Sequence, residues 1–266
     1  MEPAEEPRAS DAGGATYAQP TPALLYVHDD LTGEVSRRLG AASPAGALAR
    51  RLLDVLARSP GVRVLTLAEQ VEGVVGAGSH APFDLALAIG GAGEAVARAL
   101  HGRAGWFPRV RRIGLTREED GRGGYHLVST EGASLAAQLE GIGACRSLAV
   151  VDDTVFSGLT MLAVLEALPA RLLLRTHVFC LRGVATSIAG VAARCPITAG
   201  VSAPGRLLED VSFINASGLV LRISIRRRGQ APLAFFDRPE WIRAWFPRAH
   251  EEVLALCQRL NALLEG

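Results

Sequence analysis

Two adjacent carboxylates in the segment VVDDTVFSGLT, residues 150–160, are the side chains best suited to chemistry. Asp152 and Asp153 follow the apolar run SLAVV, which predicts a buried strand with the acidic pair at its end. Like charges this close destabilise each other unless a cation or hydrogen-bond donors separate them. We therefore expect the pair to hold a ligand, such as a vicinal diol, whose hydroxyls donate to carboxylates, or a metal ion.

Small and hydroxyl-bearing residues follow the acidic pair and lead into a predicted helix. Thr154, Ser157 and Thr160 supply hydroxyl groups, and the unpaired N–H groups at a helix start bind anions. Gly158 allows a ligand to approach the backbone closely. The segment can thus hold a sugar diol on one side and a phosphate on the other, as in a ribose 5-phosphate.

The same segment resembles the fingerprint of the type I phosphoribosyltransferases, in which two acidic residues precede a small-residue loop ending in T/S-G-x-T. The resemblance implies that Asp152 and Asp153 bind the ribose of 5-phosphoribosyl 1-diphosphate and hold Mg²⁺, in part through water. It implies transfer of the phosphoribosyl group to an acceptor, a nucleobase or another nitrogen nucleophile, with release of diphosphate. The 5-phosphate would be bound by Thr154, Val155, Phe156, Ser157, Gly158, Leu159 and Thr160.

Two further segments resemble parts of that family, so that the resemblance covers residues 84–180. AIGGAGEAVA, residues 88–97, resembles the loop that binds diphosphate through its backbone. The resemblance implies that diphosphate is bound by Gly90, Gly91, Ala92 and Gly93. Residues 116–132, polar and glycine-rich, resemble the flexible catalytic loop of orotate phosphoribosyltransferase-like members. The lysine and histidine usual in that loop are not at matching positions, so Arg117 and Arg122, with His126, are the available substitutes.

Each segment also has other interpretations. The acidic pair could be a helix cap, or the metal pair of an ATPase or receiver domain, but the last two need a lysine and the chain has none. Residues 88–97 could be a dinucleotide-binding turn, although Val96 stands where its third glycine would be, or a turn without a ligand. Residues 116–132 could be an exposed hairpin. A regulator that binds the phosphoribosyl donor without turnover, and a nucleotide-dependent oxidoreductase, remain alternatives to the transferase.

Composition excludes several functions. All 28 basic residues are arginine, which excludes Schiff-base catalysis and a P-loop lysine. A net charge of +1, with no basic stripe, gives no reason to expect a nucleic-acid partner, and no apolar stretch is long enough to span a membrane. The four scattered cysteines are typical of reduced core residues in a cytoplasmic protein. The resemblance also implies a homodimer.

Apolar strands that alternate with helices predict an α/β fold with a mainly parallel central sheet and helices on both faces. We expect a disordered tail over residues 1–22 and a phosphoribosyltransferase-like core over residues 23–202. A β-rich or irregular hood and a C-terminal helix should follow over residues 203–266. In the family the hood contacts the acceptor, which implicates Phe213, Asn215 and Phe236. Three other aromatic residues are expected to be core or interface anchors: Trp241, Trp245 and Phe246.

Overall fold

A five-stranded parallel sheet forms the centre of the computed structural model, which describes residues 25–119, 125–203, 213–226 and 229–265. The strand order is β4-β3-β7-β8-β9, and every neighbouring pair runs parallel. The strands are β3 (Leu85–Ile89), β4 (Val110–Ile113), β7 (Leu148–Val155), β8 (Thr176–Val184) and β9 (Ile197–Ala203). The predicted α/β class and mainly parallel sheet are confirmed.

Both faces of this sheet are apolar, and each is covered by helices. Alternate residues of a strand point to opposite faces, so that Leu85 and Leu87 belong to one core and Ala86 and Ala88 to the other. The first core is completed by α5 (Leu135–Gln138), η1 (Ile142–Ala144), α6 (Leu159–Ala167), α7 (Ala170–Leu173) and α8 (Ala185–Ala192). The second is completed by α3 (Leu67–Gly76) and α4 (Gly90–Ala104).

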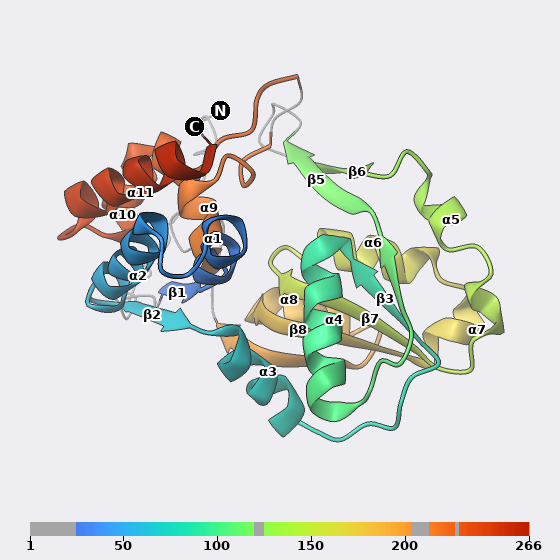
Figure 1. Cartoon of the computed structure of the whole chain (residues 1–266). Helices are drawn as coiled ribbons and strands as arrows, with labels where there is room; N and C mark the ends of the chain where they lie inside the picture. Colours follow the sequence, from blue (N-terminus) through green and yellow to red (C-terminus); the bar gives the residue numbers. More distant parts are fainter. Residues whose placement is uncertain (1–24, 120–124, 204–212, 227–228, 266) are drawn as a thin grey trace, which may run out of the picture.

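A second parallel sheet joins segments from opposite ends of the chain. Its order is β10-β1-β2, with β1 (Leu25–His28) between β2 (Val62–Leu65) and β10 (Phe213–Asn215). The sheet packs in one core with α1 (Leu31–Leu39), α2 (Pro44–Ala57), α9 (Ala216–Val220), α10 (Pro239–Trp245) and α11 (His250–Glu265). Figure 1 shows these blue and red segments side by side, away from the central sheet. Residues 25–65, expected within the core formed by residues 23–202, therefore pack with residues 213–265.

The segment expected to be a β-rich or irregular hood is mixed in structure. Besides β10 it contains the isolated bridge between Ile225 and Leu233, the short helices α9 and α10, and the 3-10 helix η2 (Phe235–Asp237). The predicted C-terminal helix is α11. Phe246 is fully buried in the core of this part, as expected of an anchor.

An antiparallel hairpin, β5 (Leu115–Glu119) and β6 (Tyr125–Ser129), follows β4. It corresponds to the polar, glycine-rich segment at residues 116–132, and Arg122 lies outside the described residues. All four cysteines carry free thiols; three are buried and Cys145 is half-buried. Within the described ranges, every helix is too short or too polar to cross a membrane.

Candidate functional site

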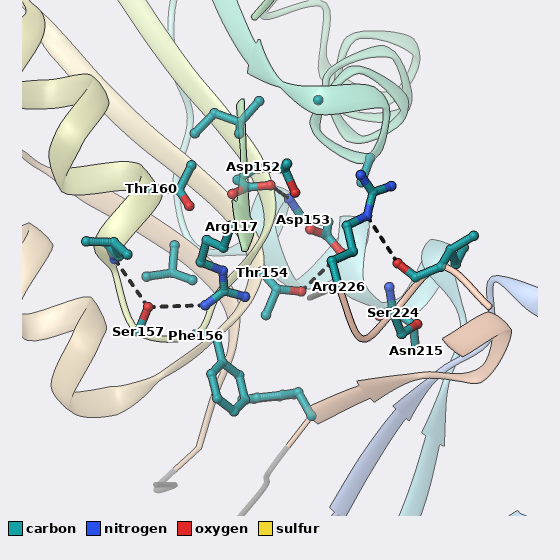
Figure 2. A pocket seen from close by; sticks show the side chains of 18 of the residues that line it. Arg117, Asp152, Asp153, Thr154, Phe156, Ser157, Thr160, Asn215, Ser224 and Arg226 are labelled. Atoms are coloured by element: carbon teal, nitrogen blue, oxygen red, sulfur yellow. Dashed lines mark hydrogen bonds between the residues drawn. The ribbon is translucent and has the colours of Figure 1, made fainter. Parts of the chain in front are cut away.

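A cleft of about 890 Å³ opens at the carboxyl ends of β3 and β7, where ligands bind in open parallel sheets. One wall is formed by the starts of α4 and α6 with the hairpin, and the other by residues from 213 onward. Figure 2 shows side chains from these separate segments around one space. Most of the residues singled out in the sequence line it: Gly90–Ala92, Arg117, Asp152–Thr160, Phe213 and Asn215.

The acidic pair lies within β7, because this strand continues past the predicted end to Val155. Asp152 Oδ1 accepts a hydrogen bond from the N–H of Asp153 at 2.8 Å. Asp153 Oδ2 accepts from Arg182 Nη2 at 2.8 Å and from Thr154 Oγ1 at 3.1 Å. The two carboxyl groups also contact each other, because a side-chain hydrogen bond between them contributes to the pKa of each. Both carboxyl groups line the cleft, where their oxygens can accept hydrogen bonds from the hydroxyls of a vicinal diol.

The surroundings of the two carboxylates move their pKa values apart. Burial, and next the neighbouring charge of Asp153, raises the pKa of Asp152 well above its ordinary value. Burial would also raise the pKa of Asp153, but the Arg182 guanidinium and the Thr154 hydroxyl hold it below its ordinary value. Asp153 thus loses its proton more readily than Asp152, and Asp152 gains most when a cation or hydrogen-bond donors enter the cleft.

The loop after the acidic pair has the form of an anion site. Gly158 adopts a φ of 77°, which favours glycine, and turns the chain into α6. The first N–H groups of this helix have no partner within the helix. Ser157 Oγ accepts from Arg117 Nη1 at 3.2 Å and from the N–H of Leu159 at 3.4 Å. A phosphate at this turn would meet backbone N–H groups, a hydroxyl and a guanidinium.

The glycine-rich segment is the first turn of α4 rather than a loop, because this helix begins at Gly90. Gly90, Gly91 and Ala92 line the cleft. Gly93, expected with them, does not line it: a Cβ there would lie 2.6 Å from the carbonyl oxygen of Val151. Gly93 therefore lets α4 pack closely on β7. The N-termini of α4 and α6 bring two sets of N–H groups to one cleft.

Four arginines line the cleft around the acidic pair, and one of them, Arg182, donates to Asp153. Arg117, on β5, lies between Asp152 and Ser157 (Figure 2). Arg112 pairs with Glu131 at 2.8 Å, and Arg226 Nε donates to the carbonyl oxygen of Ile223 at 3.5 Å. His126 lies opposite Glu118 in the hairpin, 3.7 Å from its carboxylate, and is not among the lining residues. Arg112 and Arg226 belong to no recognisable sequence motif. Only the fold brings them to the cleft.

Aromatic side chains form much of the opposite wall. Phe213 lines it as expected, but Phe236 lies buried behind it, and the neighbouring Phe235 lines the cleft instead. Trp241 and Trp245, expected as anchors, also line the cleft, and Trp245 meets Phe235 edge-on at 5.4 Å between ring centroids. This wall offers a flat ligand an apolar surface beside the amide of Asn215.

The described residues contain no group of three or more His, Cys, Asp and Glu side chains that could hold a metal ion. Mg²⁺ in phosphate-binding sites needs fewer, since it is bound by one or two carboxylates and by the phosphates themselves. Asp152 and Asp153, which both line the cleft, fit that requirement.

Comparison with known proteins finds no matching family model and no similar curated protein. Among solved structures, a hypothetical protein from Neisseria gonorrhoeae with bound ppGpp is 19% identical, with 56% of this chain and 80% of that chain covered and a TM-score of 0.39. A hypoxanthine phosphoribosyltransferase from Staphylococcus aureus is 13% identical over 58% and 81% of the two chains, with a TM-score of 0.38. An adenine phosphoribosyltransferase from Thermoanaerobacter pseudethanolicus is 16% identical over 51% and 80%, with a TM-score of 0.33. At these low values, the assignment of a function rests on the chain's own residues.

Proposed function

We propose that the protein is a phosphoribosyltransferase that binds 5-phosphoribosyl 1-diphosphate and transfers its phosphoribosyl group to an acceptor, releasing diphosphate. One observation carries the proposal: two adjacent carboxyl groups lie beside an anion-binding turn in a single cleft. A ribose with a 5-phosphate matches this arrangement, since its two ring hydroxyls donate to the carboxylates and its phosphate accepts from the turn.

The donor's two anionic ends match the two helix starts in the cleft. The 5-phosphate would lie at residues 156–160, where Arg117 and Ser157 already meet. The diphosphate would lie toward Gly90–Ala92, on the side of Arg112. Since Arg112 is paired with Glu131, it would exchange a carboxylate oxygen for a phosphate oxygen and leave the partly exposed Glu131 to water.

In the proposed reaction the C1–oxygen bond to diphosphate breaks, a bond from C1 to the acceptor nitrogen forms, and that nitrogen loses its proton to solvent. Positive charge develops on the ribose as diphosphate leaves, and the two carboxylates lie where they would stabilise it. Arg112 would neutralise the leaving diphosphate as a fixed cation that donates no proton. Mg²⁺, which Asp152 and Asp153 would hold, would add charge neutralisation as diphosphate leaves.

The wall formed by Phe213, Phe235, Trp241 and Trp245 supports a flat, aromatic acceptor. A nucleobase or another aromatic nitrogen nucleophile would stack there, within reach of the Asn215 amide. Such packing would also exclude water, which otherwise hydrolyses the donor.

Calorimetric titration with 5-phosphoribosyl 1-diphosphate in the presence of Mg²⁺ tests the proposal. The unmodified protein should bind the donor, and Asp152→Asn should weaken binding about 10- to 100-fold, the effect of losing a hydrogen bond to a charged group. Asp54→Asn, an exposed aspartate on α2, is the matched control and should bind as the unmodified protein does.

Diphosphate release, measured with a panel of nucleobases, then separates transfer from binding alone. Release that depends on an acceptor supports the transferase. Tight donor binding without release would assign the chain the role of a regulator, and absence of donor binding would refute both.

A further inference from the structure

Arg182 is the largest fully buried side chain of the described residues, with 1% of its side chain exposed. It lies on β8, next to β7 in the central sheet, with Cα paired to that of Thr154. Burial of a guanidinium is costly unless its charge and N–H groups are satisfied. The hydrogen-bond partners of Arg182 therefore indicate why a cation is buried at this position.

One terminal nitrogen of Arg182 serves both walls of the cleft. Nη2 donates to Asp153 Oδ2 at 2.8 Å and to Asn215 Oδ1 at 2.6 Å. Asp153 belongs to the central sheet and Asn215 to β10 of the second sheet. Because a guanidinium has only donors, the contact also fixes the orientation of the amide: the oxygen of Asn215 faces Arg182, and its Nδ2 is left without a partner among the described residues.

The other end of the guanidinium is held from behind. Nη1 donates to Gln70 Oε1 at 3.0 Å, while Gln70 Nε2 contacts His28 Nδ1 at 2.7 Å and the Thr66 carbonyl oxygen at 3.0 Å. Gln70 is fully buried and His28 nearly so. Arg182 is thus also held from α3 and, through Gln70, from β1, while its Nε has no partner among the described residues.

We propose that Arg182 is a positioning residue, which holds Asp153 and Asn215 in the orientations that bind donor and acceptor. By occupying Oδ2 of Asp153 it leaves only Oδ1 for the ribose, so that the second carboxylate binds in one defined direction. By occupying Oδ1 of Asn215 it leaves the amide nitrogen to donate to the acceptor. This inference rests on the proposed function, and it concerns how the two walls of the cleft are held in position relative to each other.

The test compares Arg182→Met, which removes the charge at similar length, with Arg182→Lys, which keeps it. Affinity for 5-phosphoribosyl 1-diphosphate with Mg²⁺ is measured at a temperature where circular dichroism shows each variant to be folded. Arg182→Met should bind the donor at least tenfold more weakly than the unmodified protein. Arg182→Lys should bind the donor at least threefold more tightly than Arg182→Met, since an ammonium can still pair with Asp153.

Removal of Arg182 also leaves Asp153 as an unpaired buried carboxylate, which can unfold the protein. The double variant Arg182→Met with Asp153→Asn removes that charge, so it should melt at a higher temperature than Arg182→Met and still bind the donor at least tenfold more weakly than the unmodified protein. Arg222→Met is the matched control. Arg222 pairs with Asp237 and Glu265 outside the cleft, so this variant should lower the melting temperature and leave the donor affinity within twofold.

Donor affinity unchanged in folded Arg182→Met would overturn the inference while the proposed function stands. Donor affinity unchanged in the double variant would contradict both, because that variant also lacks the Asp153 carboxylate. A loss of affinity equal in Arg182→Met and Arg222→Met would also overturn it, since the effect would then be one of stability alone. Failure of the unmodified protein to bind the donor would refute the proposed function and this inference with it.

Discussion

Asp152 and Asp153 are neighbours in the sequence but have different surroundings in the structure. Only part of that difference can be predicted from the sequence. Their types, spacing and following loop were sufficient to predict a ligand-binding pair. The cation that distinguishes them was not predictable, because Arg182 lies 29 residues later on a different strand. The only signal in the sequence is a charged residue within the apolar strand VFCLRGV, which marks a buried charge without naming its partner.

Gly93 gives a prediction at the same scale. Gly93→Ala would place a methyl group 2.6 Å from the Val151 carbonyl oxygen, so α4 must shift away from β7. We expect a loss of about 1–3 kcal/mol in the free energy of unfolding, measured by urea denaturation. Gly102→Ala, on the same helix with nothing within 4 Å, is the control and should be neutral or stabilising by up to about 1 kcal/mol. Equal effects of the two substitutions would contradict the packing role of Gly93.

At the scale of elements, the strands of the central sheet were predictable because continuous apolar runs in β3, β7 and β8 are typical of strands buried on both faces. The helical signals of α1 and α3 in the sequence are weak. Each contains glycine, and α3 also contains β-branched valines, so local propensity opposes them. A capping box at Thr66 and Glu69 marks the start of α3, and this pattern is visible in the sequence.

Ser43 is the N-cap of α2, and its contribution to stability can be measured. Ser43 Oγ accepts from the N–H of Gly46 at 3.1 Å. Ser43→Ala should therefore cost about 1 kcal/mol in the free energy of unfolding. Ser36→Ala, an exposed serine within α1, is the control and should change stability by less than about 0.5 kcal/mol. A negligible effect at Ser43 would show that the cap does not contribute to stability.

At the scale of the whole molecule, titration of a half-buried histidine should couple folding to pH. His177 stacks on Phe179, and its Nε2 lies 2.8 Å from Thr198 Oγ1. Burial, and next the nearby His80, lowers the pKa of His177 to about 4. The unfolded chain, with an ordinary pKa of about 6.5, then binds the proton more readily. Stability should fall as the pH drops from about 6.5 to 4.

Thermal melting at intervals between pH 7 and pH 4 measures this effect. His177→Gln keeps a hydrogen-bonding group and cannot become charged, so its melting temperature should decrease less across that range than that of the unmodified protein. His101→Gln, an exposed histidine on α4, should leave the pH dependence unchanged. Parallel curves for His177→Gln and the unmodified protein would contradict the assignment.

The arrangement of the two sheets was the largest feature that the sequence did not predict. Strand propensity indicates that residues 25–28 and 213–215 are extended, but it carries no information on which strands pair. The partnership of β1 with β10 depends on a shared core between α2, α9 and α11, whose contacts join residues about 200 positions apart. For the same reason the aromatic wall of the cleft could not be placed.

That pairing has a consequence for how the chain is made. Ribosomes add roughly 5–20 residues per second, so β1 and β2 emerge about 10–30 s before β10 exists. During this interval one edge of β1 lacks its partner, and the apolar faces of α1 and α2 await α11. Nascent chains are thus most exposed to aggregation before the last fifth of the polypeptide is synthesised, and transient chaperone binding to the early segment would protect them.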